Sequence, residues 1–523
     1  DNEPDADNEP DVDSALDTTG EIEGAEPPRR TVADPLRVCF VTSEVAPFAK
    51  TGGLADVSAA LPAALGRRGH DVRIFMPLYA SIDFGEREVV PVDFLHHVPV
   101  RLGSHVFHFS VFTTKLSASS DVDVYFIGCP ALYDRHGVYT GEWDEHLRYA
   151  LLARAALECC QRMGWSPDVV HAHDWHAALL PIYLRTLYSW DHQRFGGTKT
   201  VLTIHNIAYQ GMFPAEVLGN LGLADVQHLL FQDDLARGAI NFLKTGLLYA
   251  DVVTTVSRTY AREIQTPEFG QGLDALLRER RASVVGIVNG IDSEVWSPRN
   301  DPHLARPYGI DDVEEGKAAN RAHLLREMGL LGAGPEVPVF GVVSRLTSQK
   351  GLELTFEAMP EALRYLDIRF VVLGSGEAHL EEHFTWLQRT FPRKMCFYRG
   401  YSEALAHLIE AGVDIFLMPS RFEPCGLNQM YSLAYGTAPI VRRTGGLADT
   451  VVPFDRRTRR GTGFVFEHHD RRGFSWVLKQ ALAAWRDRSA WAALRRNAMR
   501  QDFSWERQVL DYERLYRHLR ARS

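Results

Sequence analysis

Apolar residues in this chain form short runs that alternate with longer stretches of helical spacing, beginning near Leu36. The segment 36–44, LRVCFVTSE, is a compact apolar run with branched residues, which is typical of a strand buried on both faces. Segment 58–72 then spaces its apolar residues as a helix does, and a glycine precedes the next apolar run, VRIFMP. This alternation predicts an α/β fold with parallel strands.

The same alternation fills the first half of the chain and restarts in the second half. Further strands are predicted at DVYFIG, DVVHAH, TVLTIH and DVVTTVS, and then, after residue 298, at PVFGVVSRL, IRFVVLGSG and DIFLMPS. We therefore expect two Rossmann-like, doubly wound domains, at 35–288 and 289–503, followed by a terminal helix at 504–523. Two such sheets carry their ligand-binding loops at the carboxyl ends of the strands, so they can face each other across a cleft.

Charge is concentrated at the start of the chain. The 523 residues include 57 Lys or Arg and 67 Asp or Glu, but residues 1–28 hold eleven of the acidic residues and no basic one. The remainder is nearly neutral, so nothing in the balance indicates a nucleic-acid surface. The opening repeat DNEPDADNEPDV is too polar to bury an apolar core, which predicts disorder for residues 1–34.

Length and cysteine usage limit the class of protein further. A single core stops growing near roughly 250 to 300 residues, which again favours two domains. No stretch of about 18 uninterrupted apolar residues occurs, so we expect no membrane span. The six cysteines form no CxxC pair and no framework spacing, which favours a reducing compartment and a cytoplasmic location.

The hexapeptide TGGLAD occurs twice, at 51–56 behind Lys50 and at 444–449 behind Arg443. Glycines permit close backbone approach, and the free N–H groups at a helix start favour an anion such as phosphate. We expect each copy to be a glycine turn that opens a helix, one on each wall of the cleft. The alternatives are two tight connections without a ligand, or a chance match. Neither copy is an ordinary nucleotide fingerprint, because GxxxxGK[ST] is absent and GxGxxG is missing from the first strand-to-helix turn.

Six motifs in order, KTGGLADV, HAHDWHA, TIHNIAYQGMF, VSRLTSQKGL, SRFEPCGL and RTGGLADT, resemble those of bacterial glycogen synthases and plant starch synthases. The resemblance extends from about Leu36 to the end of the chain. It implies a GT-B fold and retaining transfer of glucose from ADP-glucose to the non-reducing end of an α-1,4-glucan, such as glycogen or a maltooligosaccharide. It implies that no metal or other cofactor is needed. It also implies a last helix that crosses back to the first domain.

The resemblance also assigns roles to individual residues. The catalytic set is Asp174, His205, Arg345, Lys350 and Glu423. The donor-binding set is Lys50, Gly52, Gly53, Asn289, Gly374, Gly376, Tyr401, Cys425, Gly426, Leu427, Thr444, Gly445 and Gly446. Within this set, we expect Tyr401 to stack on the base, 374–376 to let the nucleotide approach its strand, and the second TGGLAD turn to hold the diphosphate more directly than the first.

The residue types themselves support part of this assignment. Arg345 and Lys350 lie five positions apart on a loop after a strand, where both can reach one departing diphosphate and stabilise its charge. The alternative is a solvated loop pair. The histidines of HAHDWHA suggest a metal, but His171 and His173 share one face of a strand while His176 falls beyond its end, so we do not expect a zinc site. Asp174 has the alternative role of a helix cap, and His205 that of a core histidine.

Glu423 follows a strand at the end where ligands bind. Many retaining enzymes of this fold carry a second Glu eight positions later, whereas this chain has Tyr431 there, as the synthases do. The sequence therefore offers no evident carboxylate pair for double displacement. We favour same-face attack, with Glu423 orienting the donor sugar and stabilising charge.

Three other functions remain open from the sequence. One is a glucan synthase that uses UDP-glucose. Another is a phosphorylase of the same fold, although no matching lysine segment for pyridoxal phosphate is evident. The third, from another class, is a catalytically inactive glucan-binding scaffold, against which the joint presence of the catalytic set argues.

Overall fold

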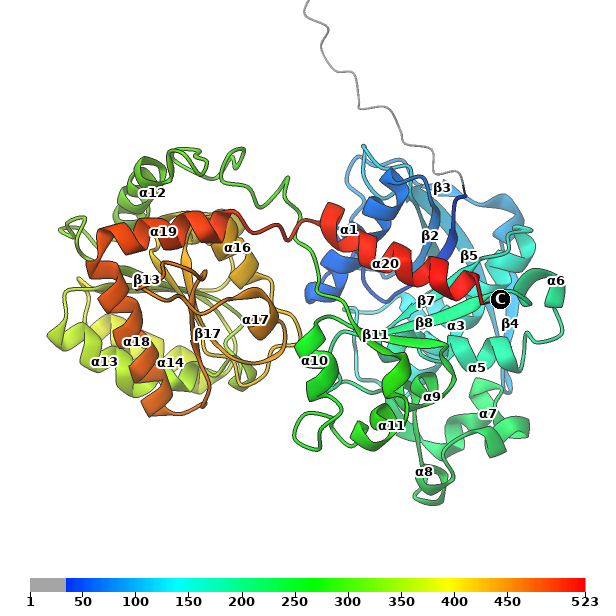
Figure 1. Cartoon of the computed structure of the whole chain (residues 1–523). Coiled ribbons are helices and arrows are strands. Elements are labelled where there is room, and N and C mark those ends of the chain that lie inside the picture. The colour runs from blue at the N-terminus through cyan, green and yellow to red at the C-terminus, as the bar shows by residue number, and fades with distance from the viewer. Residues whose placement is uncertain (1–33, 523) are drawn as a thin grey trace, which may run out of the picture.

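The molecule is built around two β-sheets whose central strands run parallel (Figure 1). The computed structural model describes residues 34–522. The acidic segment for which disorder is predicted lies outside the described residues, except for Asp34. The carboxylate of Asp34 contacts Arg520. The chain passes from the first sheet to the second between residues 287 and 312 and returns near residue 503.

Within the described residues the first sheet has ten strands, and its central part is parallel. Its spatial order is β12 (Val284–Gly286), β11 (Val252–Thr255), β8 (Lys199–Ile204), β7 (Val169–His173), β1 (Arg37–Val41), β2 (Asp71–Pro77), β6 (Asp123–Gly128), β5 (His105–Lys115) and β3 (Val90–Pro91), with β4 (Val98–Leu102) also paired to β5. The antiparallel strands β3, β4 and β5 form an extension that the predicted all-parallel pattern did not include. A separate ribbon pairs β9 (Met212–Pro214) with β10 (Ala239–Asn241).

The second sheet is entirely parallel and is buried on both faces. Its order is β15 (Met395–Arg399), β14 (Arg369–Gly374), β13 (Val339–Val343), β16 (Ile415–Met418), β17 (Ala438–Arg442) and β18 (Phe464–Phe466). Alternate strand residues belong to different cores: Phe340 packs in one apolar cluster and Val339 in the other. Burial of both faces explains why these strands appear in the sequence as continuous apolar runs.

Both sheets reverse their direction of strand progression at the strand that comes first. In the first sheet β1 lies between β2 and β7, and in the second β13 lies between β14 and β16. Ligands of open α/β sheets bind outside the carboxyl ends of the strands at such a switch point. The loops after β1 and β7, and those after β13 and β16, are therefore the places where a site is expected.

Helices connect the strands of each sheet. Those of the first domain are α1 (Gly53–Arg67), α2 (Pro130–Tyr133), α3 (Glu145–Arg162), α4 (Asp174–Ala177), α5 (Leu180–Arg185), α6 (His192–Phe195), α7 (Leu218–Leu221), α8 (Gln232–Ala236), α9 (Phe242–Tyr249), α10 (Arg258–Glu263) and α11 (Asp274–Glu279). Those of the second are α12 (Val313–Glu327), α13 (Thr355–Tyr365), α14 (Ala378–Thr390), α15 (Glu403–Gly412), α16 (Asn428–Ala434), α17 (Gly445–Thr450), α18 (Arg471–Arg486) and α19 (Arg488–Met499). Across residues 34–522, none of the helices has the length and apolarity that crossing a bilayer requires.

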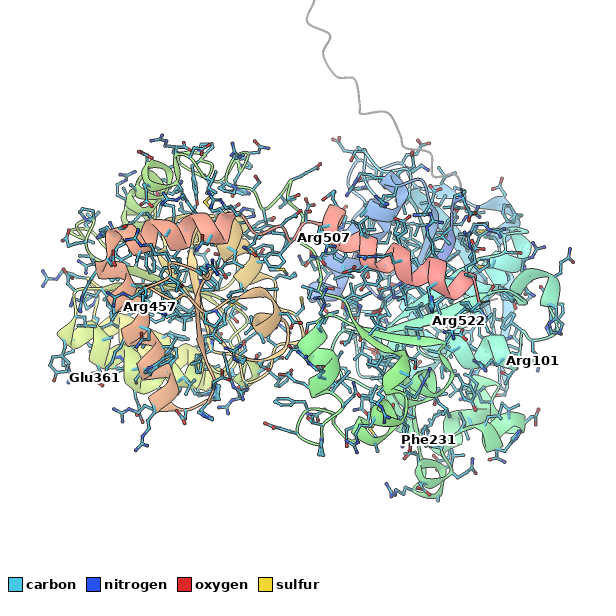
Figure 2. The ribbon with its side chains drawn as sticks, viewed as in Figure 1. Arg101, Phe231, Glu361, Arg457, Arg507 and Arg522 are labelled. Carbon is cyan, nitrogen blue, oxygen red and sulfur yellow. The ribbon has the colours of Figure 1, made fainter. Side chains whose placement is uncertain are left out.

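The last helix, α20 (Trp505–Arg520), lies against the first domain although it follows the second in sequence (Figure 1). It buries one face, which includes Val509, Tyr512 and Tyr516. Figure 2 shows Arg507 near its start and Arg522 just beyond its end. Arg68, which directly follows α1, donates to Glu513, with Nε and Oε2 2.6 Å apart. α20 therefore ties the end of the chain to the first helix.

Candidate active site

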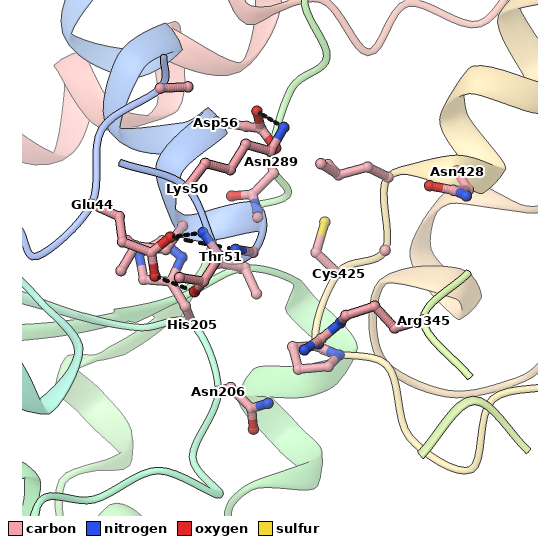
Figure 3. A pocket seen from close by; sticks show the side chains of 18 of the residues that line it. Glu44, Lys50, Thr51, Asp56, His205, Asn206, Asn289, Arg345, Cys425 and Asn428 are labelled. Atoms are coloured by element: carbon pink, nitrogen blue, oxygen red, sulfur yellow. Dashed lines mark hydrogen bonds and ion pairs between the residues drawn. The ribbon is translucent and has the colours of Figure 1, made fainter. Parts of the chain in front are cut away.

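A large cleft of about 2010 Å³ lies between the carboxyl ends of the two sheets. Figure 3 shows Lys50, Thr51 and His205 from the first domain facing Arg345, Cys425 and Asn428 from the second. The predicted site residues that line this cleft are Lys50, Gly52, Gly53, Asp174, His205, Asn289, Arg345, Lys350, Gly374, Tyr401, Glu423, Cys425, Gly426 and Leu427. The predicted residues that do not line it are Gly376, Thr444, Gly445 and Gly446.

The wall from the second domain carries two cations at its switch point. Lys350 follows β13, and its Nζ lies 2.7 Å from Oε2 of Glu423, which follows β16. Ser420 donates to the same carboxylate oxygen at 3.0 Å. Arg345 is exposed to the cleft, and its guanidinium has no acidic partner within residues 34–522. One cation is thus already paired, while the other is available to an anionic ligand.

Asp174 holds an unusual backbone position at the end of β7. Its φ is 52°, a left-handed conformation that Asp and Asn tolerate better than most residues. Its Oδ1 accepts a hydrogen bond from the backbone N–H of His205 at 2.7 Å, so it links the ends of two neighbouring strands. Burial raises the pKa of Asp174 to about 7, partly offset by hydrogen bonds from the backbone at His205 and Asn206.

His205 directly follows β8 and lines the cleft beside Asp174. Desolvation lowers its pKa to about 3, so the ring is neutral at neutral pH. Its Nε2 lies 2.9 Å from Nδ1 of His173, whereas His171 is engaged elsewhere, with Tyr516 and Thr203. The histidines of HAHDWHA therefore do not converge on one point, and no group of three or more metal-ligating side chains suited to an ion occurs among the described residues.

The first TGGLAD turn opens a helix as predicted, since α1 begins at Gly53. Its free donors are held by Glu44, whose carboxylate accepts from the Thr51 hydroxyl at 2.8 Å and from the Thr51 and Gly52 N–H groups. Lys50 extends beside the turn, and its Nζ lies 2.7 Å from Asp56 Oδ1 (Figure 3). A carboxylate thus satisfies the backbone donors, while the lysine side chain borders the cleft.

The second turn also opens a helix, α17, but its donors are occupied by the other domain. Glu263 of α10 accepts from the Gly445 N–H at 3.1 Å and from the Thr444 hydroxyl at 2.9 Å. The Gly446 N–H donates to backbone oxygens of the loop that carries Glu423. In this structure these groups face a domain contact and the loop behind the cleft, and direct binding of the donor diphosphate by Thr444, Gly445 and Gly446 stays a prediction.

Gly374 and Gly376 allow close packing of a loop in this structure, while the approach of a nucleotide to β14 stays a prediction. A Cβ on Gly374 would lie 2.1 Å from the Ser344 carbonyl oxygen, and one on Gly376 would lie 2.2 Å from that of Leu346. Moreover, the Gly376 N–H donates to Glu381. These glycines allow the loop that carries Arg345 to lie directly on the end of β14.

Three other predicted donor residues have distinct surroundings. Asn289 is buried in the cleft wall, and its Oδ1 has no hydrogen-bond partner within residues 34–522. Tyr401 is 71% exposed, so its ring is open to stacking. Cys425 is buried, and burial raises the pKa of its thiol to about 12, which suits a packing role and not a nucleophile.

Several cleft residues were missed by sequence reasoning. Asn428, at the start of α16, lines the cleft and donates to the Val343 carbonyl oxygen at 2.7 Å. Tyr431 lines it too, and its ring stacks on Trp296 with centroids 3.8 Å apart. Glu410 is buried in the wall of the cleft, and burial raises its pKa to about 8. The spacing of residues 403, 406 and 410, all on one face of α15, was a signal that could have found Glu410.

Two family profiles match the chain in succession. One is described as the starch synthase catalytic domain, over residues 37–279, and the other as glycosyl transferases group 1, over residues 331–498. A glycogen synthase from Desulforudis audaxviator is 46% identical over 497 residues, covering 92% of this chain and 96% of that relative. A glycogen synthase from Anaeromyxobacter dehalogenans is 46% identical over 496 residues, covering 92% and 99%.

The chain also resembles solved structures of glycosyltransferases. The catalytic domain of starch synthase IV from Arabidopsis thaliana, bound to ADP and acarbose, matches with a TM-score of 0.85 and 34% identity, over 93% of this chain and 100% of that one. Sucrose-phosphate synthase from Thermosynechococcus elongatus matches with a TM-score of 0.58 and 17% identity, which shows a shared fold alone.

Proposed function

Because the chain belongs to the family of glycogen and starch synthases, we propose that it transfers glucose from ADP-glucose to the non-reducing end of an α-1,4-glucan with retention of the anomeric configuration. Its membership confirms the resemblance drawn from the motifs. The two domains have the GT-B fold, and the chain is a glycosyltransferase.

The observation that carries the proposal is the convergence of cations from both domains on one cleft. Arg345 and Lys350 lie on one wall and Lys50 on the other. When the glycosidic bond to the phosphate breaks, negative charge develops on the leaving diphosphate. Fixed cations stabilise this charge without reorganising, and such interactions contribute several kcal/mol once the bound donor displaces water from around them.

Glu423 acts on the sugar side of the same bond. Lys350 holds the Glu423 carboxyl group in place at 2.7 Å, and a carboxylate beside the anomeric carbon stabilises an oxocarbenium-like transition state. Position 431 carries a tyrosine that is stacked on Trp296, so it supplies no second carboxylate. This arrangement supports same-face attack, in which the acceptor hydroxyl approaches from the side that the diphosphate leaves.

The first domain supplies contacts to the donor sugar. His205 and Asp174 lie at the ends of neighbouring strands on the wall opposite Glu423. A neutral imidazole and a carboxyl with a pKa near 7 can both exchange hydrogen bonds with glucose hydroxyls. The exposed ring of Tyr401 supports stacking on the base, and the unpartnered Oδ1 of Asn289, which is buried in the cleft wall, supports a role for this residue in binding the donor.

A donor comparison tests this function. Purified protein should release ADP from ADP-glucose in the presence of glycogen, and more slowly release UDP from UDP-glucose. Arg345→Ala should lower kcat by about 100-fold or more, because it removes a leaving-group cation. Arg457→Ala is the matched control, since Arg457 is an exposed arginine of the second domain that does not line the cleft (Figure 2). Absence of nucleotide release with both donors would refute the proposed function.

A further inference from the structure

His173 is a buried residue beside the cleft whose role the proposed function does not use. It ends β7, is fully buried, and places its Nδ1 2.9 Å from Nε2 of His205 on the neighbouring strand. Desolvation lowers the pKa of both rings, so both are neutral at neutral pH. A neutral imidazole has one N–H donor and one bare acceptor nitrogen. In this contact, therefore, one ring donates and the other accepts.

The surroundings of His173 decide which ring donates. Its Nε2 is buried and has no hydrogen-bond partner within residues 34–522. The ring packs against Phe40 and His171, with centroids 4.0 and 4.1 Å away. A buried N–H without an acceptor is rarer and costlier than a buried acceptor without a donor. The proton of His173 therefore lies on Nδ1, and His173 donates to His205.

The tautomer of His173 determines which ring nitrogen of His205 carries a proton. If its Nε2 accepts from His173, its own proton lies on Nδ1. This Nδ1 has no hydrogen-bond partner within the described residues, and His205 lines the cleft. We propose that His173 is a positioning residue that holds His205 in the Nδ1–H form, so that His205 donates a hydrogen bond to a hydroxyl oxygen of the donor sugar. The identity of that sugar rests on the proposed function.

The neighbouring His171 shows what a purely structural histidine looks like here. Its Nδ1 lies 2.7 Å from the Tyr516 hydroxyl, and its Nε2 lies 2.6 Å from the Thr203 hydroxyl. Both of its nitrogens are thus satisfied inside the protein. His173, on the same face of the same strand, instead directs to a cleft residue the one side-chain hydrogen bond that it makes within residues 34–522. This contrast is the reason to assign the two histidines different roles.

Substitution of His173 tests the inference. His173→Asn keeps an N–H donor near the position of Nδ1, whereas His173→Leu removes it at a similar size. We expect His173→Leu to lower kcat/KM for ADP-glucose by about 10- to 100-fold, as loss of an orienting partner does elsewhere, and to leave KM for glycogen unchanged. His173→Asn should retain activity within about threefold of the wild type. Equal impairment of both variants, or no impairment of His173→Leu, would overturn the inference.

A second measurement is independent of turnover. In protein labelled with ¹⁵N-histidine, two-bond NMR correlations report which ring nitrogen carries the proton, and the His205→Asn variant identifies the His205 signals. We expect Nδ1–H for His205 in the wild type and a shift toward Nε2–H in His173→Leu. An Nε2–H ring in the wild type would contradict the inference. If the wild type releases no nucleotide yet shows the Nδ1–H ring, the proposed function fails and the positioning of His205 stands.

Discussion

At the scale of single residues, the two cations on the second-domain wall of the cleft, Lys350 and Arg345, differ in their ion pairing. Lys350 is paired with Glu423 at 2.7 Å, while Arg345 has no acidic partner within residues 34–522. In the proposed function, a diphosphate in the cleft would meet one free cation, Arg345, and a second, Lys350, whose charge also holds the Glu423 carboxyl group. In the proposed reaction, Lys350 would face both the leaving diphosphate and Glu423.

Removal of Lys350 should thus affect catalysis more than folding. We expect Lys350→Ala to lower kcat by about 100- to 1,000-fold, in the range found when one stabilising group is removed from a charge-developing site. Lys350→Arg, which keeps the charge, should retain more activity than Lys350→Ala. Steady-state kinetics and thermal unfolding of the same preparations test this. A fall in melting temperature large enough to account for the lost activity would instead indicate a structural role.

The raised pKa of Asp174 leads us to expect that the stability of the fold depends on pH. Burial raises its pKa to about 7 from an ordinary value of 3.8, so the folded state holds the proton more tightly than the unfolded state. Its contribution to stability is fully present below pH 3.8 and is lost as the pH rises through about 7. Asp174→Asn removes this titration and tolerates the left-handed backbone. Denaturant unfolding should therefore show the variant gaining stability relative to the wild type between pH 5 and pH 8. A difference that does not change with pH would contradict this explanation.

The resemblance of the motifs identified fourteen residues that line the cleft, and several of them, such as Arg345 and Glu423, follow a predicted strand at its carboxyl end. The partners of the glycine turns could not be found in this way. Glu44 and Glu263 hold corresponding groups of the two TGGLAD turns, yet Glu263 is 181 residues from Thr444 in sequence. The local pattern predicted an anion at each turn, and only the folded chain shows that side-chain carboxylates supply it.

At the scale of elements, α20 is the helix whose packing is most open to test. Tyr512 and Tyr516 are both buried on it, but only Tyr516 has a hydrogen-bond partner, His171, within the described residues. Tyr516→Phe leaves a buried ring nitrogen of His171 unpaired and should lower the free energy of unfolding by about 1 to 3 kcal/mol.

The matched control for this prediction is Tyr512→Phe. The Tyr512 hydroxyl is buried without a partner in the described part of the chain, so its removal should be neutral or slightly stabilising. Chemical denaturation of both variants gives the comparison. Equal destabilisation by the two substitutions would show that the contact with His171 does not contribute to stability.

The strands and the major helices could be predicted because each buries a regular apolar pattern. The prediction failed at the edge of the first sheet. Strand β5 alternates exposed and buried residues, as an antiparallel strand with one covered face does, and its partners β3 and β4 are short. Such strands carry a weaker apolar signal than the central parallel ones, which explains why the antiparallel extension was missed.

At the scale of the whole molecule, several contacts connect the domains, including two between pairs of helices. One is made by α20, which returns to the first domain and forms ion pairs with α1, as between Arg67 and Glu506. The other is the contact of α10 with α17, where Thr259 donates to Asp449 in addition to the Glu263 contacts. The cleft lies between the domains, so the separation of its walls depends on these contacts. The existence of two domains follows from the sequence pattern, whereas their relative placement does not.

The central claim is that cations from the facing domains hold the leaving diphosphate of a nucleotide sugar. A crystal structure with bound ADP tests it most directly. The predicted result is a diphosphate in contact with Arg345 and Lys350, with the base beside Tyr401. Nucleotide bound outside the cleft, or within it but away from both cations, would contradict the claim.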